Sequence, residues 1–122
     1  DENGLKPDVN QHDWRTGIAD GPEEVRKAVR YLVKYGAEVI KLCATGGVLS
    51  EGDAVGVTQY GDDELRAAVD EARKHERRVM AHAHGAEGIR LAAEAGVASI
   101  EHGSFVDSAA ARVMVAKGTF LV

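Results

Sequence analysis

The fold of this chain is decided by the stretch RVMAHAHGAEGIRLAAEAGVASIEHG, residues 78–103. It predicts a buried strand over 78–83, a helix that carries Ile89, Ala92 and Ala93 at helical spacing, and a second strand over 97–101. Gly96 ends the helix, as glycine commonly does before a strand. A strand, a helix and a strand in this order are typical of parallel strands joined by a crossover helix. The stretch therefore predicts an α/β protein with a parallel sheet.

Helix–strand units of the same kind lie on both sides of this stretch. Upstream we expect a helix over 22–36, a strand over 37–42, a glycine-rich loop over 44–61 and a helix from Asp62; downstream we expect a helix from Ser108 and a strand over 119–122. The helix–strand pattern leaves two architectures open, a doubly wound sheet and a (β/α) barrel. The four helix–strand units form a domain, residues 22–122, that follows an N-terminal arm or loop over residues 1–21.

Composition narrows the class of protein. The chain has 122 residues, 44% of them hydrophobic and 29% charged, which is typical of one soluble globular domain. Its formal net charge is −5, and its one basic cluster, residues 73–78, falls at an expected helix end. We therefore expect no nucleic-acid partner. No apolar run approaches the roughly 20 residues of a membrane span, so we expect no membrane partner either.

The cysteine count and the first residues bear on the compartment. Cys43 is the single cysteine, so an intrachain disulfide is excluded and a reducing compartment is favoured. We expect a cytoplasmic location. The chain opens with DENG, without Met and without the pattern of a signal peptide, so we expect a processed product or a fragment of a longer protein.

Lys41 lies inside the apolar strand expected over 37–42. Burying its cation is costly, so it either pairs with a carboxylate at the strand end or becomes a neutral amine. A neutral amine can act as a base, form a Schiff base as in a lyase, or take up carbon dioxide to give a carbamate, which is an anionic metal ligand. Taken alone, Lys41 favours the pairing with a carboxylate.

Histidines stand at the carboxyl ends of the next two strands. His82 and His84 are two residues apart and face one side of the sheet, and His102 ends the following strand. They form either a hydrogen-bonded lining of a polar pocket or a set of nitrogen ligands, with one of the first pair free to contact substrate. Three consecutive strands that each end in a ligand-capable residue favour a metal site of Lys41, His82 and His102.

Four further side chains are additional candidates. His12 lies in the N-terminal arm and either reaches a metal or is an exposed loop residue. Cys43 either adds a soft ligand to the metal site or is a small buried core residue, and the second interpretation is the better one. Asp107 is an acid or base, or, better, the N-cap of a helix. Tyr60 donates a hydrogen bond from the loop over 44–61, expected to be a mobile cover, or packs against the core.

The segments IKLCATGG around Lys41, MAHAHG around His82 and SIEHGSF around His102 together resemble the amidohydrolase superfamily. The resemblance is to its prolidase- and imidazolonepropionase-like branch and covers roughly strands 4 to 7 of the barrel, so it implies that the four helix–strand units form half of a TIM-type (β/α)8 barrel. It implies that the site holds one or two divalent ions, usually zinc, and that Lys41 is carboxylated and bridges the two metals. It implies that His82 and His102 are the ligands from strands five and six. His84 would orient substrate or shuttle a proton.

The resemblance implies a metal-dependent hydrolase whose activated water attacks a peptide-like amide or lactam of a small-molecule substrate. A phosphodiester or phosphotriester hydrolase on the same metal site and a non-catalytic metal-binding barrel fragment stay open as alternatives. The family's first-strand histidine pair and last-strand aspartate have no counterpart in these residues. Four strands also leave two open edges and an apolar face. We therefore expect a homo-oligomer, a dimer of half-barrels or a multiple of it.

Overall fold

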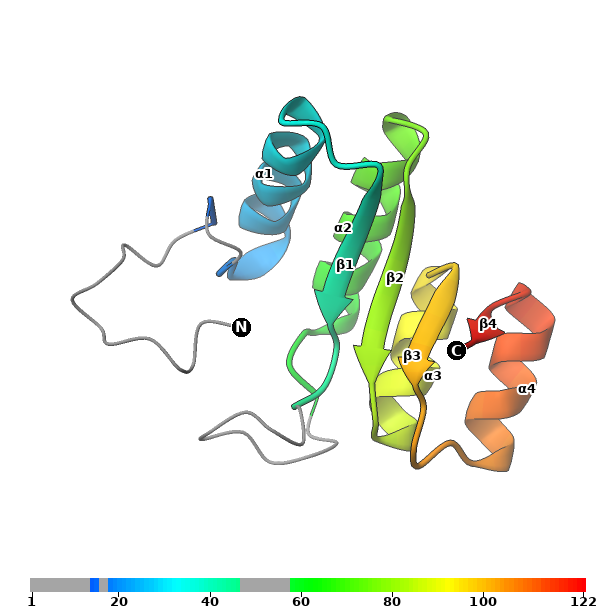
Figure 1. Ribbon diagram of the computed structural model, residues 1–122. Coiled ribbons are helices and arrows are strands. Elements are labelled where there is room, and N and C mark those ends of the chain that lie inside the picture. Colours follow the sequence, from blue (N-terminus) through cyan, green and yellow to red (C-terminus); the bar gives the residue numbers. More distant parts are fainter. Residues whose placement is uncertain (1–13, 16–17, 47–57) are drawn as a thin grey trace.

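A computed structural model describes residues 14–15, 18–46 and 58–122 of the chain. Helices and strands alternate through these residues, as the sequence predicts (Figure 1). The elements are α1 (Gly21–Lys34), β1 (Val39–Cys43), α2 (Asp62–Lys74), β2 (Arg78–Ala83), α3 (Ala86–Ala95), β3 (Ser99–His102), α4 (Ser108–Lys117) and β4 (Phe120–Leu121). Most of the predicted arm and the middle of the predicted loop over 44–61 lie outside the described residues. The domain boundary therefore stays a prediction.

The strands form one parallel sheet in the order β1-β2-β3-β4. Lys41 lies opposite Met80, Met80 opposite Ser99, and Ser99 opposite Phe120, so one row of side chains crosses all four strands. Each crossover advances by one strand in the same direction, whereas the strand order of a doubly wound sheet reverses at a switch point. The described sheet is therefore a segment of a barrel, as predicted.

All four helices lie on one face of this sheet, side by side in the order of the chain (Figure 1). The strand residues that face them are buried, among them Ile40, Val79, Ala81 and Ile100. Many of the buried positions are alanine, which lets helices and strands approach closely. The core of the described residues thus lies between one layer of helices and one side of the sheet.

The opposite face of the sheet is uncovered by the described residues. Val39 at one edge is 49% exposed and Phe120 at the other is 74% exposed. Side chains alternate between the two faces of a strand, so every second residue of β1 and β2 points to this open face. The side chains that the strands direct to the open face near their carboxyl ends are therefore the candidates for a functional site.

Two strands begin two residues later than predicted, because a helix cap takes up the residues before them. Gly96 follows α3 with a φ of 99°, and the next residue, Val97, donates its N–H to the carbonyl of Ala92 at 3.3 Å. This bond belongs to a left-handed helix cap of the Schellman type and not to the sheet. β3 therefore begins at Ser99, and β1 begins late for the same reason, after Gly36.

A buried ion-pair cluster joins α1 to α2 on the helical side. The Glu71 side chain is 5% exposed and lies 3.1 Å from Arg30, 3.3 Å from Lys74 and 3.3 Å from His75. Burial alone would raise the pKa of Glu71, but the hydrogen bonds from Lys74 and His75 and the charges of Lys74 and Arg30 outweigh it and lower the pKa. The ionised carboxylate is therefore the form that stabilises the contact between the two helices.

Replacing Glu71 with glutamine is expected to lower the free energy of unfolding at pH 7 by about 1–2 kcal/mol, because charge-assisted hydrogen bonds are lost. A pKa that is lower in the folded state gives stability above the unfolded value of 4.5, and this stability is lost as the pH falls through the folded value. The difference from wild type should therefore shrink below pH 4.5 in urea unfolding. Asp70→Asn, at an exposed position of the same helix, is the control. A difference that does not depend on pH would contradict the assignment.

None of the helices in the described part of the chain combines the length and the apolar character that a membrane crossing requires.

Candidate metal centre

Three histidines meet at the carboxyl ends of β2 and β3. The ring centroids of His82 and His84 are 4.7 Å apart, those of His82 and His102 are 4.8 Å apart, and those of His84 and His102 are 5.0 Å apart. One ring nitrogen from each residue lies within 4.8 Å of the others. His82 lies in β2, His84 follows just after that strand, and His102 is the last residue of β3. The structure therefore brings these three side chains together at this end of the sheet.

The backbone at the end of β3 is bent to bring His102 into this cluster. His102 has a φ of 76°, in the left-handed region that non-glycine residues rarely adopt. Its N–H donates to the carbonyl of Val122 at 3.0 Å, and the N–H of Gly103 donates to the carbonyl of Ala83 at 2.9 Å. These bonds to β4 and β2 hold the strained turn. The turn leaves the His102 ring stacked on His84, at an interplanar angle of 16°.

His82 offers a free nitrogen to the cluster. Its Nε2 is buried and has no hydrogen-bond partner among the described residues. The ring also has a hydrogen bond with the backbone of Gly46. Buried polar atoms are nearly always paired, so an unpaired nitrogen calls for a partner that the protein atoms do not supply.

The surroundings keep this imidazole neutral. Burial lowers the pKa of His82, the charges of His84, His102 and Lys41 lower it further, and the Gly46 hydrogen bond only partly offsets these effects. The neutral ring is the form that binds metal. A neutral histidine with an unpaired buried nitrogen beside two further imidazoles is a donor set that fits zinc or a similar divalent ion.

Lys41 lies on the open face of β1 and is exposed, so the expectation that it is buried in an apolar strand is wrong. The sheet is covered on one side only, and Lys41 alternates with Ile40 and Leu42, which face the helices. No described carboxylate lies within ion-pair distance of Lys41, which removes the pairing at the strand end within this part of the chain. Its charge nevertheless acts on His82. Lys41 is thus near the cluster.

Cys43 is exposed, so its expected place in the core is wrong for the same reason of alternation. It lies opposite His82 in the sheet register but is outside the group of converging ligand atoms. Asp107 accepts a hydrogen bond from the N–H of Ala110 at 2.8 Å, which confirms it as the N-cap of α4. His12 lies outside the described residues.

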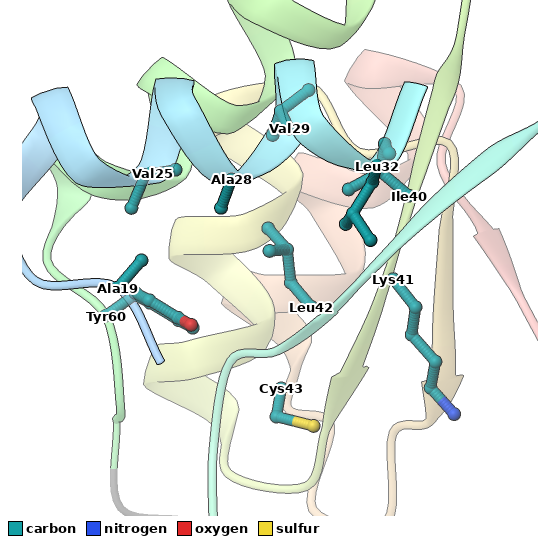
Figure 2. Close-up of a pocket in the computed structure, with 10 residues that line it drawn as sticks. All are labelled: Ala19, Val25, Ala28, Val29, Leu32, Ile40, Lys41, Leu42, Cys43 and Tyr60. Carbon is teal, nitrogen blue, oxygen red and sulfur yellow. The ribbon is translucent and has the colours of Figure 1, made fainter. Parts of the chain in front are cut away.

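Tyr60 is half-buried and packs against the core. Burial, and then the charges of Cys43, Glu64 and Asp20, raise the pKa of its hydroxyl. It borders an apolar cavity of about 150 Å3 between α1 and β1, with Lys41 and Cys43 on the wall formed by the strand (Figure 2). Its lining residues come mostly from α1 and β1, and β1 is the first strand of the described sheet, beside α1 (Figure 1).

Sequence reasoning missed the residues that hold the cluster in place. Thr45 is 1% exposed, and its Oγ1 accepts a hydrogen bond from the N–H of His84 at 2.9 Å. The Oγ of Ser104 lies 2.8 Å from Nδ1 of the same histidine. Gly88, in the first turn of α3, leaves room for the Thr45 methyl group, which an added Cβ would overlap. Thr45 and Ser104 follow strands within the segments IKLCATGG and SIEHGSF, and that position is the signal that could have found them.

The fold and the cluster together define a segment of a (β/α)8-barrel protein with a candidate metal centre at the carboxyl ends of its strands. The model of the amidohydrolase family matches residues 4–122, and the chain belongs to this family. The resemblance predicted from the three motifs is therefore confirmed.

Individual relatives agree with this assignment. The chain is 45% identical over 112 residues to ochratoxinase of Aspergillus niger, a match that covers 89% of the chain and 23% of that protein. A crystal structure of a Xaa-Pro dipeptidase with bound methionine in the active site has a TM-score of 0.94 and 42% identity, and the match covers 99% of this chain and 30% of that one. A crystal structure of a prolidase complexed with N-methylphosphonate-L-proline has a TM-score of 0.85 and 42% identity, and the match covers 98% of this chain and 32% of that one. The chain thus spans about a quarter to a third of these relatives.

Proposed function

We propose that the chain is part of a metal-dependent hydrolase that cleaves amide bonds in small peptide-like substrates. The observation that carries the proposal is the cluster of His82, His84 and His102 around the unpaired Nε2 of His82. The similarity to a Xaa-Pro dipeptidase and to a prolidase supports a peptide-like amide over a lactam or a phosphoester.

His82 and His102 would hold the divalent ion, which we propose to be zinc. Lys41 would add an oxygen ligand after carboxylation, in which the carbon of carbon dioxide joins Nζ and a proton is released. This modification is supported by the place of Lys41 on the open face, near His82. When bound, the ion supplies a Lewis acid that polarises the scissile carbonyl and lowers the pKa of water to about 7. One ion or two are compatible with this donor set.

His84 acts on the substrate in this proposal. Its Nδ1 is engaged by Ser104, so Nε2 is the atom available to orient the substrate or to carry a proton. The ring is buried and stacked on His102, which fixes its place beside the metal ligands. A donor or acceptor that is held next to the reacting bond lowers the entropic part of the activation barrier of the reaction.

We also propose that further strands cover the open face, and that in the isolated chain they come from a second copy. The outer edges of β1 and β4 are unpaired among the described strands, and apolar side chains such as Val39 and Phe120 are exposed between them. Two four-stranded segments related by a two-fold axis along the barrel would pair each β1 with the other copy's β4. This arrangement closes eight parallel strands and brings both clusters to one mouth.

The test is to assay the zinc-loaded chain across a size-exclusion peak whose mass is read by light scattering. We expect hydrolysis of Xaa-Pro and related dipeptides in a species of twice 13.0 kDa, lost on treatment with a chelator and restored by zinc. A lactam and a phosphotriester in the same panel test the alternative substrates. Amide hydrolysis that survives chelation would contradict the metal-dependent mechanism, and a monomer at micromolar concentration would contradict the assembly.

A further inference from the structure

We infer that Ser104 is a positioning residue, which orients the His84 ring, while Thr45 anchors the backbone of the same histidine. The inference concerns how the chain prepares His84 and goes beyond which residues form the site. Only its consequence for catalysis rests on the proposed function.

The loop after β3 holds His84 at two atoms. Ser104 Oγ lies 2.8 Å from Nδ1 of His84, and the N–H of Phe105 donates to the carbonyl of His84 at 2.9 Å. His84 is 6% exposed, so its ring is largely shielded from water. The side-chain bond and the backbone bond come from consecutive residues, and the backbone bond therefore holds the serine hydroxyl in reach of the ring.

The loop after β1 holds a third atom of His84. Its N–H donates to Thr45 Oγ1 at 2.9 Å, and Thr45 Oγ1 donates in turn to the carbonyl of Gly46 at 3.2 Å. This donation leaves the lone pairs of the threonine oxygen directed at the histidine amide. His84 is thus held at its amide nitrogen, its carbonyl oxygen and Nδ1, from loops on either side of β2, and Nε2 is the remaining polar atom.

A partner at one ring nitrogen decides where the other points. The Ser104 hydroxyl can donate to Nδ1 or accept from it, so it bonds the neutral imidazole in either tautomer and holds the ring plane, and with it the direction of Nε2. His82 is held differently, through the backbone of Gly46, which no side-chain substitution removes. The serine hydroxyl is therefore the group through which a single substitution releases the ring of one histidine in the cluster.

The test reads the ring nitrogens of His84 directly, by long-range 1H–15N correlation of the metal-free, 15N-histidine-labelled chain. Spectra are recorded at about pH 8, above the ordinary histidine pKa of roughly 6.5. The His84 signals are assigned by their loss in His84→Gln. We expect the Nδ1 chemical shift of His84 to move in Ser104→Ala, because the hydroxyl no longer bonds this atom, and to return to the wild-type value in Ser104→Thr, which keeps the hydroxyl. Ser108→Ala removes an exposed hydroxyl from the start of α4 and serves as the matched control.

An unchanged Nδ1 chemical shift in Ser104→Ala would overturn the inference, and so would a change of the same size in Ser108→Ala. Ser104 is exposed, so its alanine variant should fold, and the backbone amide spectrum checks this. The Nδ1 chemical shift is read without metal or substrate, so a chain that proves inactive as a hydrolase still tests the inference. If the hydrolase is active, Ser104→Ala should lower kcat about 10–100-fold, with recovery in Ser104→Thr.

The role of Thr45 is tested by hydrogen exchange at the His84 amide. Thr45→Val keeps the shape of the side chain and removes the acceptor, and we expect the amide to exchange at least about tenfold faster, since a lost bond of about 1.4 kcal/mol corresponds to that factor. Thr45→Ser keeps the acceptor and should retain slow exchange. Equal exchange in wild type and Thr45→Val would overturn the anchoring role.

Discussion

Replacing His82 with alanine is expected to weaken zinc binding by on the order of 100-fold or more, with little change in the free energy of unfolding. Removal of a residue that hydrogen-bonds to a metal ligand already lowers metal affinity by about 10–100-fold. Removal of the ligand itself should therefore lower the affinity by at least the upper end of that range. Stability should change less, because Nε2 of this ring has no hydrogen bond to lose among the described residues. Titration calorimetry with zinc and urea unfolding of the metal-free chain measure the two quantities separately.

The matched control is His75→Ala. His75 caps α2 beside Glu71, on the helical side of the sheet and at the end where β2 begins, away from the cluster. The zinc affinity of His75→Ala should lie within about a factor of two of wild type, although loss of this side chain slightly weakens the ion-pair cluster around Glu71. Equal zinc affinity in His82→Ala and wild type would show that the cluster is not the metal site. A parallel loss in His75→Ala would show that zinc binds surface histidines without selection.

Gly88→Ala is expected to destabilise the chain, although alanine favours a helix over glycine by about 1 kcal/mol. An added Cβ would overlap the methyl group of Thr45, which is 1% exposed. Overpacking of this kind costs about 1–3 kcal/mol and should outweigh the helical gain. Urea unfolding measures the net loss. Because Thr45 also anchors His84, the substitution should disturb the His84 amide signal in the same samples.

The same substitution should reverse its sign when Thr45 is serine. Thr45→Ser removes the overlapping methyl group, and the next nearest atoms to the added Cβ are then Ala44 O at 3.7 Å and Cβ of residue 45 at 3.8 Å, which are ordinary contacts. In that background Gly88→Ala should stabilise the chain by up to about 1 kcal/mol. A Gly88→Ala that costs the same in both backgrounds would show that the contact with Thr45 is not what requires the glycine.

The sequence determined the order of elements and the convergence of the histidines. Alternating strands and helices with short connections specify a parallel sheet, and the carboxyl ends of its strands must share one edge. The motifs around Lys41, His82 and His102 therefore had to meet, whatever the details of packing. The N-cap at Asp107 was also predictable, because a cap depends on residues only three positions apart.

Other features depended on contacts between distant residues. The helix caps after Gly36 and Gly96 shortened two strands, because a left-handed cap takes up residues whose apolar character resembles that of a strand. Lys41 and Cys43 proved exposed, because apolar neighbours in a sequence do not show which face of a sheet is covered.

The sequence by itself thus determined a parallel barrel segment with histidines at the strand ends, because periodicity and strand direction are local properties. The tertiary structure alone decided the state of those histidines. His84 meets Thr45 and Ser104, which are 39 and 20 residues away, and His102 adopts a positive φ that bonds to β2 and β4 hold in place. Such contacts arise only when separate strands are packed together, so the place of Thr45 and Ser104 after their strands indicates candidates but does not determine the atoms that they contact.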